Sequence, residues 1–145
     1  MAELVIRPIG LADVEIAVDW AAEEGWNPGL YDADLFYAAD PGGFLMGFLG
    51  DQRVTAISAV RYGDSFGFVG FYICRPEFRG KGFGLATWRK AMARLDGRSV
   101  GLDGVVAEQA NYVRSGFVLA HRNIRFAGTA KSSETAIQLC RISIA

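Results

Sequence analysis

The segment Tyr72-Ile-Cys-Arg-Pro-Glu-Phe-Arg-Gly-Lys-Gly-Phe-Gly84 joins an apolar run to a segment with helical periodicity. Its glycines alternate at positions 80, 82 and 84, where glycine permits positive φ and lets a ligand approach the backbone closely. Successive N–H groups and the positive end of a helix attract phosphate oxygens, and Arg79 and Lys81 add formal positive charge. The segment therefore predicts a phosphate-binding turn between a strand and a helix; the alternative is a flexible turn carrying basic side chains.

Two commoner phosphate-binding loops do not fit this segment. A Rossmann fingerprint requires glycine at position 85 or 87, where Leu85 and Thr87 stand. A Walker loop requires Ser or Thr after Gly-Lys, but Gly82 follows Lys81. Nucleotide binding by either motif is therefore disfavoured.

The residues on both sides of the turn indicate a single layered domain over residues 1–145. No fixed-period repeat or linker divides the chain. The order of elements predicts an α/β (α+β layered) fold, with a mixed, mostly antiparallel central sheet flanked by helices. Apolar and β-branched runs predict strands at Leu4–Pro8, Phe44–Leu49, Val54–Tyr62, Phe66–Cys74, Val100–Leu102, Phe117–Phe126 and Ile137–Ile144. Helical spacing predicts helices from Leu11 to a stop at Gly25, over Tyr31–Ala39, after Gly84 and over Ala107–Arg114. The helix after Gly84 carries an apolar stripe at Leu85, Trp88, Met92 and Leu95.

Composition bounds the location and the partners of the chain. The net charge is −1, but residues 1–52 carry ten acids and one base, whereas residues 75–98 carry seven bases and two acids. The overall balance gives no reason to expect nucleic acid as a partner. Cys74 and Cys140 form no disulfide framework, no signal peptide is visible, and no uncharged stretch reaches the roughly 18–20 residues that span a bilayer. We therefore expect a cytoplasmic protein without a membrane partner and, with one histidine, without a metal site.

Two motifs carry a resemblance to a known family. The pattern Tyr72-x-Cys-x-Pro-x-x-Arg79-Gly-x-Gly-x-Gly84 resembles the coenzyme A signature of the GNAT superfamily of N-acetyltransferases. Tyr112-Val-Arg-Ser-Gly-Phe117 is similar to that family's second element, and the resemblance covers roughly residues 3–127. It implies an acyl-CoA N-acyltransferase fold and transfer of an acetyl group from acetyl-CoA to a primary amine by direct attack.

The resemblance also assigns roles to individual residues. It implies a splayed strand at Phe71–Cys74 whose main chain pairs with the pantetheine arm and, at Tyr72, faces the acetyl carbonyl. Tyr112 matches the family's hydroxyl that protonates the departing thiolate, while Val105 stands where asparagine is frequent. Cys74 is then a small packing residue rather than a nucleophile. The implied coenzyme-binding residues are Tyr72, Ile73, Cys74, Arg79, Gly80, Lys81, Gly82, Phe83 and Gly84.

The sequence is less specific about the residues that bind the acceptor amine. In this family the segment between the first two helices lines the acceptor pocket, which here implicates Trp20, Glu23 and Trp26. Acids and aromatic rings together suit a small cationic amine; the alternative is that the acids only solvate helix faces. No single general base stands out, and a water chain is equally compatible; the candidates are Glu23, Glu24, Asp64, Asp103 and His121.

Other readings stay open at this stage. The chain could be a non-catalytic acyl-CoA-binding module that keeps the loop but lacks a competent base. Residues 19–29 and 57–64 also resemble bacterial acetyltransferases that carry a second acetyltransferase-like half, of which this chain would match the first. Dimerisation is common in the family, so a homodimer is left open, although the sequence shows no interface signature.

Overall fold

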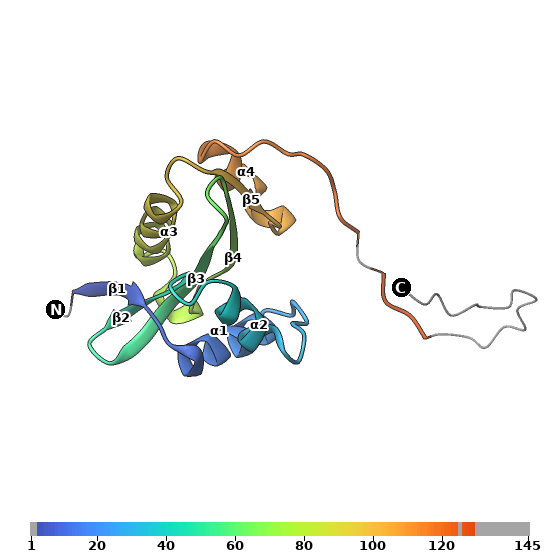
Figure 1. Cartoon of the computed structure of the whole chain (residues 1–145). Coiled ribbons are helices and arrows are strands. Elements are labelled where there is room, and N and C mark those ends of the chain that lie inside the picture. Colours follow the sequence, from blue (N-terminus) through green and yellow to red (C-terminus); the bar gives the residue numbers. More distant parts are fainter. Residues whose placement is uncertain (1–2, 125, 130–145) are drawn as a thin grey trace, which may run out of the picture. The chain divides into compact units, whose positions relative to one another are not determined.

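Five strands form one sheet in the order β1-β2-β3-β4-β5 in the computed structural model, which describes residues 3–124 and 126–129 (Figure 1). The first four strands are antiparallel, and β5 runs parallel to β4. This arrangement confirms the predicted mixed, mostly antiparallel sheet. The strands are β1 Leu4–Pro8, β2 Phe44–Leu49, β3 Gln52–Tyr62, β4 Phe66–Cys74 and β5 Ser99–Leu102.

Three helices pack against the sheet in two layers. Helices α1 (Leu11–Glu23) and α2 (Asp32–Ala39) lie on one face of the sheet and α3 (Phe83–Arg94) on the other (Figure 1). The buried face of α1 packs on β2, β3 and β4, and the resulting core includes Val14, Ala17, Trp20, Ala21, Phe44, Met46, Ala56, Val60 and Ile73. The predicted helix stop is confirmed, because Gly25 follows α1 with φ of 79°.

The buried face of α3 differs from the predicted stripe. Trp88 and Leu95 are buried as expected, but Leu85 is exposed and Met92 is only partly buried, and Thr87 and Ala91 take the remaining buried positions. The reason for this difference is a buried hydrogen bond between two polar side chains. The hydroxyl of Thr87 lies 2.7 Å from that of Thr55 on β3, and both side chains have 0% exposure. This hydrogen bond turns the small, partly polar face of α3 toward the sheet, which a count of apolar residues does not anticipate.

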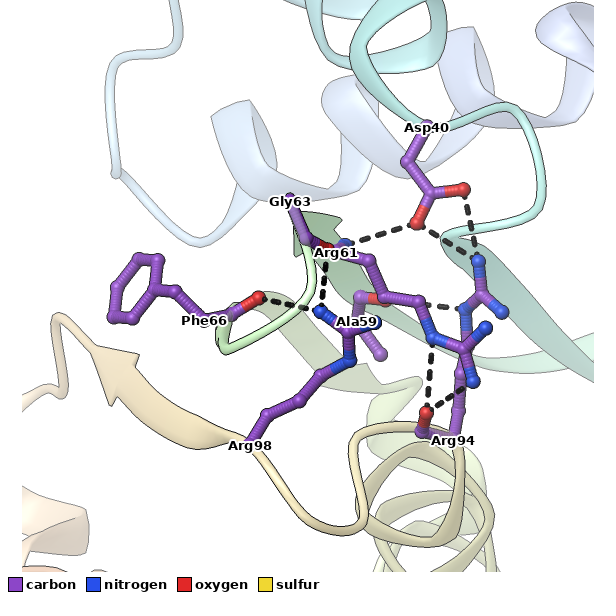
Figure 2. Close-up of polar contacts among 7 residues, drawn as sticks. All are labelled: Asp40, Ala59, Arg61, Gly63, Phe66, Arg94 and Arg98. Carbon is purple, nitrogen blue, oxygen red and sulfur yellow. Dashed lines mark hydrogen bonds and ion pairs between the residues drawn. The ribbon is translucent and has the colours of Figure 1, made fainter.

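A charged cluster joins the two helical layers at the end of the sheet where β3 stops (Figure 2). The carboxylate of Asp40, after α2, accepts hydrogen bonds of 2.8 Å from Nη2 of Arg94 at the end of α3. It also accepts the backbone N–H of Arg61, whose side chain donates to the carbonyl oxygen of Arg94. Arg94 Nε donates to the Ala59 carbonyl oxygen. We call these four residues the Asp40–Arg94 cluster.

By its contacts the chain divides into a unit over residues 1–105 and a unit over residues 106–145. In the second unit, a 3₁₀ turn (Val106–Glu108) leads into α4 (Gln109–Arg114), which agrees with the predicted short helix. One domain over residues 1–145 stays a prediction.

The strand predicted at Phe117–Phe126 is wrong for the described residues of that segment, 117–124 and 126, which adopt no regular structure. A strand needs a neighbour to accept its backbone hydrogen bonds, and the described part of the chain offers this segment none. The segment's apolar side chains Val118, Leu119, Ile124 and Phe126 are accordingly exposed. The predicted strand Ile137–Ile144 lies outside the described residues.

Candidate active site at the end of strand β4

Strand β4 carries a β-bulge near its end. Its register against β3 passes from Gly70 opposite Ser58 to Ile73 opposite Ala56, so that two β4 residues, Phe71 and Tyr72, face the single β3 residue between them. Phe71 has φ of 47°, which is uncommon for an aromatic residue and marks a built feature of the strand. The pairing of β4 with β5 ends at Val69, as expected for a splayed strand. The last paired residue of β5, Leu102, is also the end of that strand, so Phe71–Cys74 lie beyond the β4–β5 ladder.

The glycine-rich turn follows directly. Arg75 adopts an extended conformation before Pro76, and a 3₁₀ turn (Pro76–Phe78) leads into the glycines. Gly80 and Gly82 have φ of 75° and 82°, and a β-carbon at either position would meet no atom within 4 Å. Gly82 is the N-cap of α3, whose first N–H groups have no partner within the helix. Gly80 and Gly82 adopt the left-handed conformation, and the space beside them is open. This open turn fits a diphosphate.

The third glycine serves close packing. A β-carbon on Gly84 would lie 3.0 Å from the Tyr72 hydroxyl oxygen, so the first turn of α3 sits against β4. The Tyr72 ring packs on Trp88 of α3 at 5.3 Å between ring centroids. Ile73 is buried in the core, and Phe83 packs on Phe78 at 6.4 Å. These contacts fix the turn relative to the strand end.

The basic side chains of the turn are held in place. Arg79 donates from Nε to the Cys74 carbonyl oxygen at 2.9 Å and from Nη2 to the carboxylate of Glu24. Lys81 donates from Nζ to the Glu77 carbonyl oxygen at 3.0 Å and lies 5.3 Å from the Phe78 ring centre. Both cations are thus anchored beside the glycines. The charge of Arg79 is partly compensated by Glu24, whereas Lys81 bonds to a carbonyl oxygen and adds positive potential for an anion.

Cys74 lies on the α3 side of the strand end. Burial raises the pKa of its thiol, against the lowering influence of the nearby Arg79 guanidinium. A thiol that stays protonated is a poor nucleophile, which favours the packing role expected for this residue.

The residues predicted for the acceptor side are engaged within the protein. Trp20 is buried, and the Arg75 guanidinium lies 5.1 Å from the centre of its ring. Glu23 forms an ion pair with Arg75, and Trp26 packs half-buried against the core. Sequence reasoning missed the role of Arg75.

The charge asymmetry of the sequence was the available signal for these contacts. Four acids of residues 1–52 form ion pairs with later arginines: Asp13 with Arg53, Glu23 with Arg75, Glu24 with Arg79 and Asp40 with Arg94. The acid-rich segment is therefore partly neutralised by the base-rich one.

Tyr112 belongs to the second unit and lies on α4. Burial, and secondarily the charge of Glu108, raises the pKa of its hydroxyl, so the group stays protonated at neutral pH. The Tyr112 carbonyl oxygen accepts the backbone N–H of Phe117 at 3.1 Å. Gly116, with φ of 91°, makes the intervening turn. This local geometry explains the spacing between the tyrosine and the Gly-Phe pair.

Comparison with known proteins identifies the family. The model of the acetyltransferase (GNAT) family matches residues 12–117, which include the bulged strand, the glycine turn and Tyr112. The chain belongs to the GNAT acetyltransferase family. A curated relative, holothin acyltransferase from Pseudoalteromonas sp. (strain SANK 73390), is 38% identical over 122 residues. The match covers 84% of this chain but 42% of that relative, so the chain spans less than half of the relative's length.

Solved structures show the same fold at low sequence identity. A GNAT-family protein from Xanthomonas campestris pv. campestris superposes with a TM-score of 0.67 at 18% identity, covering 86% of this chain and 95% of that one. Ard1 from Thermoplasma volcanium gives 0.67 at 20% identity, with coverages of 79% and 82%. The sheet and helices described above are therefore those of a GNAT acyl-CoA N-acyltransferase fold.

The described residues form a surface depression but no metal site and no membrane-spanning helix. Within residues 3–124 and 126–129, no three His, Cys, Asp or Glu side chains are grouped so that they could hold a metal ion. No helix in that part of the chain is long and apolar enough to cross a bilayer. An open depression of about 330 Å³ lies at the far end of α3 from the glycine turn, lined by Pro8, Gly42, Leu45, Lys90, Ala93 and Arg94.

Proposed function

We propose that this GNAT protein is an N-acetyltransferase that moves the acetyl group of acetyl-CoA to a primary amine. The observation that carries the proposal is the coincidence of the β4 bulge at Phe71 and Tyr72 with the open glycine turn at the start of α3. The bulge can receive an acyl carbonyl, and the glycine turn can receive a diphosphate.

Each part of the site has a defined task in this proposal. Arg79, Lys81 and the peptide N–H groups from Gly80 to Gly84 bind the diphosphate, while the main chain of Tyr72–Cys74 binds the pantetheine arm. When bound, acetyl-CoA supplies the acyl group and the thiolate leaving group. A backbone N–H near Tyr72 stabilises the negative charge that develops on the acyl oxygen.

Tyr112 is proposed as the general acid. The amine nitrogen forms the new bond to the acyl carbon as the carbon–sulfur bond breaks, and the nitrogen loses its proton to water. The leaving sulfur takes a proton from the Tyr112 hydroxyl, a role that rests on the resemblance of the Tyr112–Phe117 motif to the family pattern; this hydroxyl is protonated at neutral pH. Solvent then reprotonates the tyrosine.

The acceptor is proposed to approach from the side of α1 and α2, near Trp20, Glu23 and Trp26. Holothin, which is in the name of the curated relative, is the first acceptor to test. A cytoplasmic location and a homodimer stay predictions.

Calorimetry with acetyl-CoA and an assay of coenzyme A release test the proposal. Gly80→Ala should weaken acetyl-CoA binding up to about tenfold, because alanine costs roughly 1–2 kcal/mol in the left-handed region and the unliganded turn relaxes away from the conformation that binds the diphosphate. Gly97→Ala is the matched control, since Gly97 has the same φ of 75° and equally open surroundings after α3. Equal losses in both variants, or no acetyl-CoA binding by the unmodified protein, would contradict the proposal. Binding without turnover of any amine would instead indicate a non-catalytic acyl-CoA-binding module.

A further inference from the structure

The bulge separates two sides of the strand end. Tyr72 lies against Trp88 and Gly84, on the side of α3 and the glycine turn. Phe71 lies on the opposite side, against Phe36 of α2 and Phe44 of β2. If acetyl-CoA binds along the turn as proposed above, an incoming amine reaches the acyl carbon from the side of Phe71. This step rests on the proposed function.

The side of Phe71 is aromatic. Its ring lies 5.7 Å from that of Phe36, edge to face at 67°, and 5.8 Å from that of the buried Phe44. Phe36 and Phe71 are only partly buried, so both retain surface for a ligand. The chain that leads into and forms α2 adds further exposed apolar side chains, at Leu30, Tyr31 and Leu35. The surface beside the bulge therefore suits an apolar ring.

Part of the negative charge of the same region is compensated by ion pairs. Three of the six acids from Asp19 to Asp40 form ion pairs with arginines, namely Glu23, Glu24 and Asp40. A cationic acceptor would need free carboxylates to bind its charge and a base to remove its proton. The ion pairs of Glu23 and Glu24 therefore argue against binding of a cationic amine by these two carboxylates.

We propose that Phe36 and Phe71 determine acceptor specificity and select an aromatic amine of low basicity. The rings of Phe36 and Phe71, which we call the aromatic wall, pack against the ring of the acceptor. Such a contact between two rings raises affinity about threefold to tenfold. The nitrogen of such an amine is unprotonated at neutral pH, so attack needs no dedicated base. An alkylamine, with a pKa near ~10.4, would first have to be deprotonated.

The experiment compares para-methoxyaniline with diaminobutane as acceptors and measures coenzyme A release between about pH 6.5 and about pH 8.5. We expect kcat/KM to be at least about tenfold higher for the arylamine and nearly independent of pH. For diaminobutane the rate should rise with pH, up to about tenfold per unit, because the neutral fraction grows.

Two variants assign the selectivity to the aromatic wall. Phe36→Leu should raise KM for the arylamine about threefold to tenfold, with KM for acetyl-CoA unchanged. Phe71→Leu should raise KM for the arylamine by a similar factor, and its KM for acetyl-CoA is measured alongside because Phe71 is part of the bulge that receives the acyl group. Phe66→Leu is the control, because Phe66 lies at the other end of β4 and packs on Tyr62 in a comparable ring pair at 6.1 Å. It should change neither KM.

The outcomes separate this inference from the proposed function. Preference for diaminobutane, or unchanged arylamine KM in both wall variants, overturns the inference while acetyl-CoA turnover stands. Failure of the unmodified protein to bind acetyl-CoA refutes the proposed function instead. If acetyl-CoA binds but no amine turns over, calorimetry on the coenzyme A-saturated protein must show tighter binding of para-methoxyaniline than of diaminobutane; the reverse order also overturns the inference.

Discussion

The hydroxyl pair of Thr55 and Thr87 offers a sharp test of how α3 is held on the sheet. Thr87 Oγ1 lies 3.0 Å from the Phe83 carbonyl oxygen, which can only accept, so Thr87 donates there. The proton between the two hydroxyls, 2.7 Å apart, must therefore come from Thr55. Both side chains have 0% exposure, so water cannot replace either partner. The directions of the two bonds make the two threonines unequal.

This inequality sets the expected magnitudes. Thr87→Val leaves the buried Thr55 hydroxyl without an acceptor and should cost about 2–3 kcal/mol of unfolding free energy. Thr55→Val leaves Thr87 bonded to Phe83 and should cost about 0.5–1 kcal/mol. In the double variant no buried hydroxyl is stranded, so it should be more stable than Thr87→Val alone, with a coupling of about 1–2 kcal/mol.

Urea denaturation followed by far-ultraviolet circular dichroism, analysed by linear extrapolation, gives these free energies. All variants should share one m-value, since valine is isosteric with threonine and the fold is unchanged. The reasoning is refuted if Thr55→Val costs as much as Thr87→Val, or if the two losses simply add in the double variant.

Three further predictions concern the rest of the molecule. Arg94→Met should cost about 2 kcal/mol in thermal unfolding, because it strands the Asp40 carboxylate, whose side chain is 14% exposed; an unchanged melting temperature would contradict the role of the Asp40–Arg94 cluster. Tyr112→Phe should lower kcat about a hundredfold and leave KM for acetyl-CoA within about twofold, and an unchanged kcat would remove the general-acid assignment. The raised pKa of Cys74 means that the folded protein binds the thiol proton more tightly than the unfolded chain does. Its contribution to stability should therefore be present below the ordinary thiol pKa of about 8.5 and be lost as pH rises toward the folded-state pKa, a loss that Cys74→Ala should abolish in urea titrations.

Local signals explain why much of the fold was predictable. Strand and helix bounds followed from runs of apolar residues, and the glycine turn followed from Gly80, Gly82 and two neighbouring bases. The left-handed conformation of both glycines is what their spacing predicted.

The remaining features depend on residues far apart in the chain. The bulge at Phe71 arises from cross-strand register against β3, and the face of α3 depends on Thr55, which lies 32 residues before Thr87. Likewise, the charge asymmetry was visible in the sequence, but the pairing of Glu23 with Arg75 was not. Isolated windows of sequence contain no information on such partners.

The ion pairs between the end of α1 and the glycine turn have a consequence for engineering. Because Glu23 and Glu24 are bonded to Arg75 and Arg79, mutagenesis of the α1 terminus aimed at new acceptors would also disturb the arginines beside the donor turn. A library that keeps these carboxylates and randomises Leu30, Tyr31 and Leu35 would vary exposed positions alone. Donor binding and acceptor choice could then be altered separately.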